Sequence, residues 1–208
     1  MKTKKLTLTA IFLAIIFLFA LTPVGFINLV FIKATIVHVP VIIGSIVLGP
    51  KIGALLGAAF GGISIFINTT TPSLLSFAFS PFIPVLGTTH GSPWAVVIAL
   101  VPRILTGILP FFIYRGVMAF FKQNPKRQAP ALFAAGIGGS AVNTLLVMNL
   151  IYFLFKDAYA QARGIPIGES VYKAVLTVIF VNGVPEALVA GIAAAAVGTV
   201  LLKLVKTT

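Results

Sequence analysis

The chain of 208 residues is 59% hydrophobic and only 9% charged, and its mean hydropathy is +1.14. Because soluble domains average about 25% charged residues, this composition excludes a soluble globular protein and indicates an integral membrane protein. The formal net charge of +12 arises mostly from short segments between apolar runs, which is typical of orientation signals and lipid headgroup contacts and argues against nucleic-acid binding.

Six apolar segments follow one another along the chain, and each is interpreted as a membrane span because about 20 apolar residues cross a bilayer. They cover about residues 6–22, 34–49, 52–67, 94–121, 130–155 and 173–204. The first follows the basic start "MKTKK" without a cleavage site, so we expect a retained helix rather than a signal peptide. The sequence therefore predicts an all-α membrane protein with six transmembrane helices in a single integral membrane domain over residues 1–208.

The distribution of basic residues predicts how these spans are oriented. With six spans, the side of the membrane that holds both termini carries ten lysines and arginines, whereas the other side carries four in longer loops. Because cytoplasmic loops carry an excess of Lys and Arg, we expect both termini in the cytoplasm. The long charge-free loop over residues 68–93, between the third and fourth spans, is then expected outside. Five or seven spans would split this bias.

Motifs for enzymatic chemistry are missing from the sequence. There is no cysteine, which excludes disulfides and a thiol nucleophile, and two histidines with three acidic residues argue against a protein-only metal centre. The stretch "GSIVLGPK" (44–51) approaches P-loop spacing, but Pro50 stands where the phosphate-binding lysine belongs. We therefore expect no enzymatic activity, no ATPase motif in this chain and no cofactor.

Two ionisable residues, Arg103 and Glu186, interrupt the apolar spans. Charged groups at membrane depth cost about 2.5–3.5 kcal/mol on insertion scales and usually face a cavity or a partner. One interpretation is that the two residues pair with each other, and the other is that Arg103 binds a ligand carboxylate through its planar guanidinium. Pro102 and Pro110 favour a kinked helix around Arg103 whose freed carbonyl groups line a cavity. Both interpretations stay open at this point.

The charge-free loop before the fourth span contains polar and aromatic side chains suited to a small polar ligand. The candidate ligand-binding residues there are Asn68, Thr69, Phe77, Phe79, Ser80, His90 and Trp94. Long loops in compact domains are usually functional or disordered, and the aromatic residues argue against disorder, so we expect a lid over a site. Trp94 taken alone is more typical of an interfacial aromatic belt. Asn143 in the fifth span is a further candidate, although a buried amide there also fits a contact between helices.

Small residues recur at four-residue spacing in several spans. Examples are the pair Ala10 and Ala14 and the series Gly53, Gly57 and Gly61. Such spacing lets helix backbones approach closely in lipid. Most of these stripes fit internal packing, whereas a stripe on the outside of the bundle would dock a second membrane protein.

Together with these features, three stretches make the chain resemble the S components of energy-coupling factor (ECF) vitamin transporters. They are "AIFLA" (10–14), "GFINLVFIKATIVHVPVIIGSIVLGPKIGALLG" (25–57) and "SFAFSPF…HGSPWAVVIALVPRILTG" (76–107), and the last two look like the pantothenate-type S component. The resemblance implies a bacterial plasma-membrane subunit that binds a vitamin, pantothenate above all, from outside. It also implies a transmembrane coupling subunit and two cytoplasmic ATPase subunits as partners. In this family the alanine pair on the first helix faces the coupling subunit, which implies docking through Ala10 and Ala14.

Alternatives to this function come from three classes of protein. An S component for folate, pyridoxine or hydroxymethylpyrimidine has similar sequence features, because the volume of a pocket is not visible in a sequence. A self-sufficient secondary carrier would need coupling groups and often internal repeats, and no clear repeat is present. A membrane protein without a ligand would use Arg103 only for pairing within the protein.

Overall fold

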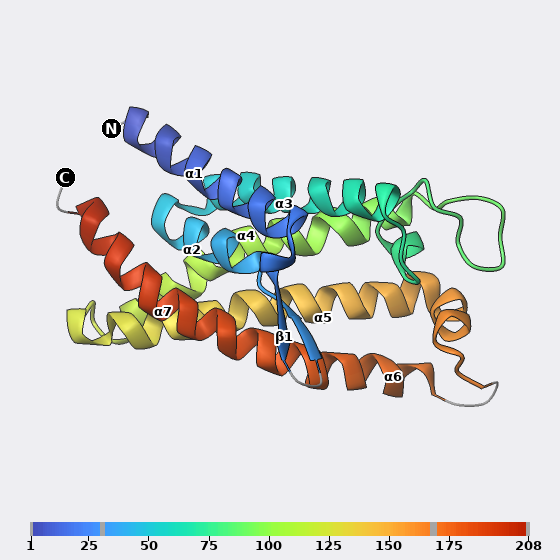
Figure 1. Ribbon diagram of the computed structural model, residues 1–208. Coiled ribbons are helices and arrows are strands. Elements are labelled where there is room, and N and C mark those ends of the chain that lie inside the picture. Colours follow the sequence, from blue (N-terminus) through green and yellow to red (C-terminus); the bar gives the residue numbers. More distant parts are fainter. Residues whose placement is uncertain (1, 30–31, 167–169, 207–208) are drawn as a thin grey trace.

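The computed structural model describes residues 2–29, 32–166 and 170–206, which form an elongated bundle of helices (Figure 1). The helices are α1 (Lys2–Leu21), α2 (His38–Leu48), α3 (Pro50–Thr70), α4 (Trp94–Phe120), α5 (Gln128–Arg163), α6 (Val171–Val178) and α7 (Val184–Lys206). Between them lie the 3-10 turns η1 (Pro23–Gly25), η2 (Ser76–Ala78) and η3 (Pro125–Arg127) and the π-helical turn η4 (Ile179–Gly183). Strands β1 (Phe26–Leu29) and β2 (Ile32–Thr35) form a hairpin.

Within the residues that the structure describes, five helical segments are long and apolar enough to cross a membrane, in agreement with the predicted class of helical membrane proteins. They are Thr3–Leu21, Pro50–Thr70, Trp94–Phe120, Pro125–Arg163 and Val171–Leu204. The shorter apolar helix α2 has 11 residues, and at 1.5 Å per residue it is about 16 Å long, roughly half the hydrocarbon thickness of a bilayer. Of the second span expected over residues 34–49, only α2 is helical, since residues 34 and 35 belong to strand β2.

A short two-stranded hairpin before α2 is an addition to the helical fold that the sequence predicts. β1 and β2 pair in antiparallel register, with Phe26 opposite Thr35 and Leu29 opposite Ile32. The hairpin runs across the bundle in Figure 1, and β2 contacts η4 and α7. Each strand has four residues, and within a continuous apolar run so short a strand cannot be distinguished from a helix by its hydrophobic pattern.

The two ends of the bundle carry different segments. The start of α1, the end of α7 and the turn between α4 and α5 lie at one end, whereas the α3–α4 segment, the end of α5 and the start of α6 lie at the other (Figure 1). α3 continues to Thr70, so Asn68 and Thr69 are helical and the α3–α4 segment covers residues 71–93. α5 bends at Phe155, whose φ of −137° is not helical, and it continues to Arg163 beyond the end expected at residue 155.

The glycine stripe on α3 packs against the backbone of α4 next to Arg103. A Cβ atom added at Gly57 would overlap the carbonyl oxygen of Arg103, and one added at Gly53 would overlap that of Gly107. Two helix backbones approach this closely only where the facing residues have no side chain. The stripe is thus internal packing, and it fixes the position of Arg103 relative to α3.

Candidate ligand-binding site

Arg103 lies inside α4 with only 7% of its surface exposed, and the preceding proline supplies it with a hydrogen-bond acceptor. Pro102 has no N–H, so the carbonyl group of Ile98, four residues earlier, loses its regular helical partner. The Nη1 atom of Arg103 donates to this carbonyl oxygen at 2.7 Å. Pro102 therefore frees the acceptor that stabilises the buried charge, which explains why the two residues occur together in an apolar span.

Two aromatic rings flank the guanidinium group. The Cζ atom of Arg103 lies 5.5 Å from the ring centroid of Phe60 on α3 and 5.0 Å from that of Phe79 in the α3–α4 segment. Contacts of this kind stabilise a cation, most of all when it is removed from water. The Nε atom is buried and has no hydrogen-bond partner among the residues that the structure describes. Since a guanidinium has five N–H donors, Arg103 retains donors for a ligand.

Arg103 lines two cavities at once. The first, which we call the hairpin cavity, has a volume of about 280 Å³ and is lined by Ala20, Thr35, Val37, Phe60, Ile63, Ser64, Ile67, Asn68, Phe79 and Arg103. The second, which we call the Glu186 cavity, has a volume of about 150 Å³ and is lined by Arg103, Asn143, Thr144, Val147, Met148, Val178, Asn182 and Glu186. Apolar walls with a few convergent polar groups are the usual surroundings of a small polar ligand.

A π-helical turn orients the polar residues of the Glu186 cavity. Pro185 follows η4 and lacks the N–H that a regular helix would bond to the carbonyl of residue 181, which favours the wider turn. Asn182 and Glu186 lie four residues apart and line the same cavity. The Oε1 atom of Glu186 accepts a hydrogen bond from the backbone N–H of Thr35 at 2.8 Å. The carboxylate therefore also anchors the end of β2.

Arg103 and Glu186 share a cavity but use different protein partners. Within the described ranges, the guanidinium donates to the carbonyl of Ile98. The carboxylate accepts from the backbone of Thr35 and also interacts with the hydroxyls of Thr35 and Thr144. The direct pairing that the sequence left open is thus not the contact found here. Both charged groups keep hydrogen-bonding capacity that a ligand in the Glu186 cavity can use.

The polar residues at the end of α3 fasten the α3–α4 segment to that helix. The hydroxyl of Ser76 donates to Oδ1 of Asn68 at 2.7 Å, and the hydroxyls of Thr69 and Ser80 are hydrogen-bonded at 2.7 Å. The Nδ2 atom of Asn68 donates to the carbonyl of Ser64 at 2.8 Å, which leaves its second N–H for a ligand in the hairpin cavity. Thr69 and Ser80 line neither cavity.

The aromatic candidates of the α3–α4 segment are dispersed. Phe79 lines the hairpin cavity, whereas Phe77 is 2% exposed and packs edge-on against Phe155 at 5.8 Å between ring centroids. His90 is exposed, and its carbonyl oxygen accepts hydrogen bonds within the segment. Trp94 begins α4 and is 54% exposed. Phe77, His90 and Trp94 therefore lie outside the two cavities that Arg103 lines.

Sequence reasoning missed several residues of the hairpin cavity. Thr35 was hidden because the hairpin reads as part of a helical apolar run. Phe60 and Ser64 precede Asn68 at four-residue steps, which places the three on one face of α3. That spacing was the available signal, since it extends a face that already contained a candidate ligand-binding residue.

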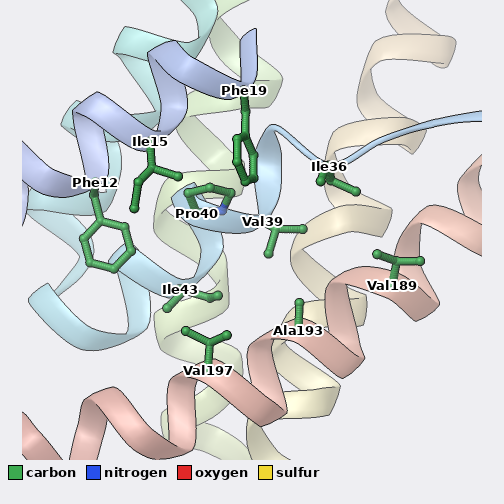
Figure 2. Close-up of a pocket in the computed structure, with 10 residues that line it drawn as sticks. All are labelled: Phe12, Ile15, Phe19, Ile36, Val39, Pro40, Ile43, Val189, Ala193 and Val197. Atoms are coloured by element: carbon green, nitrogen blue, oxygen red, sulfur yellow. The ribbon is translucent and has the colours of Figure 1, made fainter. Parts of the chain in front are cut away.

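Two faces of α1 have different surroundings. Ala10 and Ala14 are exposed on the outside of the bundle. Phe12, Ile15 and Phe19 instead line a cavity of about 310 Å³ between α1, α2 and α7 (Figure 2). All ten residues that line this cavity are apolar, so it offers no group that would orient a polar ligand. The cavities at Arg103 are therefore the better candidates for a polar ligand.

Comparison with known proteins reveals similarity over nearly the whole chain. The family of ECF transporter substrate-specific components matches residues 4–198. The pantothenic acid transporter PanT of Lactococcus lactis subsp. cremoris (strain MG1363) is 38% identical over 194 residues, which cover 90% of this chain and 94% of the relative. The pantothenate transporter PanT of Leuconostoc mesenteroides subsp. mesenteroides (strain ATCC 8293) is 31% identical over 212 residues, which cover 97% of this chain and 93% of the relative.

Proposed function

The chain belongs to the family of ECF transporter substrate-specific components, and from this premise we propose that it captures pantothenate for an importer whose partner subunits supply the energy. Two relatives that cover nearly its full length are named pantothenate transporters, which supports this substrate. The chain is a multi-pass protein of the bacterial plasma membrane. Because its sequence contains no P-loop, ATP hydrolysis would take place in two cytoplasmic ATPase subunits.

The observation that carries the proposal is the position of Arg103, a buried cation with unused donors at two cavities. Pantothenate has one carboxylate, a central amide and two hydroxyl groups. A guanidinium binds a carboxylate through two parallel hydrogen bonds, and such charge-assisted bonds are stronger than neutral ones. Arg103 would hold the carboxylate, and the amides of Asn68 and Asn143 would contact the remaining polar groups.

Six membrane-inserted elements fit the proposed transport role. Five long helical segments would cross the bilayer, and the hairpin with α2 would complete the sixth within a single domain of residues 1–208. The excess of basic residues at the end that holds both termini would place that end in the cytoplasm. Arg103 would then lie about 13 Å along α4 from Trp94, a depth that a ligand entering from the α3–α4 side can reach.

The exposed face of α1 fits the docking of a coupling subunit. Ala10 and Ala14 are one helical turn apart and exposed, and small residues at this spacing let a partner helix approach closely in lipid. The transmembrane coupling subunit would dock there. It would transmit ATP hydrolysis in the two ATPase subunits to this chain, so that pantothenate bound outside is released inside the cell.

Thermal unfolding of the purified chain against a panel of vitamins tests the substrate. We expect pantothenate to raise the unfolding temperature, because a ligand present at 100 times its Kd stabilises the folded state by about 2.7 kcal/mol. Folate, pyridoxine and hydroxymethylpyrimidine should have no such effect. Stabilisation by one of these three and not by pantothenate would contradict the proposed substrate.

Uptake in cells tests the source of energy. In cells that lack the ATPase subunits, we expect this chain to support no accumulation of pantothenate against a gradient, and restoring the subunits should restore accumulation. Sustained accumulation without them would identify the chain as a self-sufficient secondary carrier.

A further inference from the structure

We infer that the Glu186 cavity is a subsite for hydroxyl or N–H donors, so that Glu186 fixes the direction in which the ligand binds and excludes ligands with an anionic group at both ends. This inference rests on the proposed function, because it concerns the same site. It follows from the position of Arg103 between one cavity that contains an acidic residue and one that does not.

The polar groups of the Glu186 cavity favour a ligand that donates hydrogen bonds. A carboxylate accepts at about four lone-pair positions and donates none. The oxygens of Glu186 receive the N–H of Thr35 and also interact with the hydroxyls of Thr35 and Thr144, which leaves acceptor capacity for a ligand. The Oδ1 atom of Asn143 is buried and, among the residues described, has no hydrogen-bond partner. Buried acceptors without partners are unfavourable, so a ligand group that enters this cavity gains most if it carries O–H or N–H donors.

The same carboxylate repels an anionic group. Two negative charges close together in a medium of low dielectric constant interact unfavourably and strongly, so a ligand carboxylate beside Glu186 is disfavoured. None of the residues that line the hairpin cavity is acidic. Arg103 reaches that cavity too, and Asn68 has a spare N–H there. The carboxylate of the ligand therefore belongs on the hairpin-cavity side of Arg103.

Pantothenate can place donors in the Glu186 cavity and keep its carboxylate out of that cavity in only one of its two orientations. Its carboxylate would face Arg103 from the hairpin cavity, and its two hydroxyl groups would donate to Glu186 and to the neighbouring amides of Asn143 and Asn182. The reverse direction would place the carboxylate beside Glu186. Glu186 is therefore a specificity-determining residue for the hydroxyl-bearing end of the ligand.

A merely structural role of Glu186 makes a different prediction. Its hydrogen bond with the backbone of Thr35 anchors the hairpin, and loss of this anchor alone would weaken every ligand by the same factor. A role in specificity would instead weaken only ligands that carry the hydroxyl groups. The ratio of two affinities thus distinguishes the two roles, whereas the affinity for a single ligand does not.

The test measures the Kd values of two ligands, pantothenate and its analogue without the two hydroxyl groups, by calorimetry. For the wild-type chain we expect pantothenate to bind roughly 10- to 100-fold more tightly than the analogue, since hydrogen bonds to charged groups contribute this much. In Glu186→Gln, which keeps an acceptor for Thr35, this ratio should fall to near one. A ratio in Glu186→Gln that stays at the wild-type value would overturn the inference and leave Glu186 as an anchor.

A second measurement needs no variant. An analogue in which a second carboxylate replaces the hydroxyl-bearing end, N-succinyl-β-alanine, should not bind detectably to the wild-type chain where pantothenate saturates it. Binding as tight as that of pantothenate would overturn the inference. If the wild-type chain binds neither pantothenate nor its hydroxyl-free analogue, the proposed function itself fails, and this outcome is distinct from a failure of the role of Glu186.

Discussion

The glycine stripe of α3 and the alanine pair of α1 share one sequence pattern but have opposite surroundings. Gly53, Gly57 and Gly61 face the backbone of α4 so closely that a Cβ atom would collide with it. Ala10 and Ala14 are exposed on the outside of the bundle. Small residues at four-residue spacing thus indicate close helix packing without telling which helix packs there. In this chain one stripe packs against α4 beside Arg103, and the other is exposed.

The largest effect is expected from a side chain in the buried stripe. Gly57→Val would force α3 away from the carbonyl of Arg103, and overpacking of this kind costs about 1–3 kcal/mol or more. We expect a lower unfolding temperature together with loss of pantothenate binding, measured on the purified chain. Gly62→Ala is the matched control on the same helix, because no atom lies within 4 Å of its added Cβ, and it should leave both properties unchanged. Equal behaviour of the two variants would refute the role of the stripe.

Removal of the charge beside the stripe should separate binding from folding. In Arg103→Ala we expect pantothenate to bind roughly 10- to 100-fold more weakly, as for the loss of a charged hydrogen bond, while the chain remains folded and purifiable. Arg115→Ala, on the same helix but exposed, is the control and should bind normally. Unfolding of Arg103→Ala alone would instead support a structural role of this arginine.

The exposed stripe should respond in the opposite way to the buried one. Ala14 is exposed on the outside of the bundle, so in Ala14→Trp we expect the pantothenate affinity to stay within about twofold, a change of less than 0.5 kcal/mol. Assembly with the coupling subunit, measured by co-purification, should be lost. Phe153→Trp alters an exposed position on α5 and should permit assembly. Normal assembly and uptake in Ala14→Trp would count against docking at this face.

The smallest effect is expected where a polar contact lies outside both stripes. Thr69→Val removes the hydroxyl that bonds to Ser80 at 2.7 Å, and a single hydrogen bond contributes about 0.5–1.5 kcal/mol to stability. A slightly lower unfolding temperature with unchanged pantothenate affinity is expected from thermal unfolding and calorimetry. A strong loss of affinity would mean that Thr69 contacts the ligand after all.

Hydrophobicity makes the long helices predictable, whereas the hairpin cannot be predicted from the same pattern. The long apolar helices are required by the bilayer, which satisfies no backbone polar groups, so their composition is decisive. The strands of the hairpin have four residues each and lie within an apolar run, where a helical and an extended segment look alike. α2 was consequently expected to be longer than its 11 residues.

The candidate site is predictable from the sequence where burying a residue in an apolar span has a high free-energy cost. Arg103 stood out because a charge in an apolar span is costly, and the nearby prolines suggested freed carbonyl groups, of which Ile98 is the one that Arg103 uses. The polarity of Thr69 and Ser80 predicts contact with a ligand, but their hydroxyls bond to each other. Whether a hydroxyl faces a cavity or another hydroxyl depends on the path of the α3–α4 segment, which composition does not determine.

The most direct test of the role of Arg103 compares two ligands that differ only in the carboxylate. Calorimetric titrations would measure the affinities of the wild-type chain and of Arg103→Gln for pantothenate and for pantothenol, in which an alcohol replaces the carboxylate. We predict that the wild-type chain prefers pantothenate roughly 10- to 100-fold and that Arg103→Gln binds the two ligands with nearly equal affinity. Full retention of the preference in Arg103→Gln would contradict the assignment of Arg103 as the residue that binds the carboxylate.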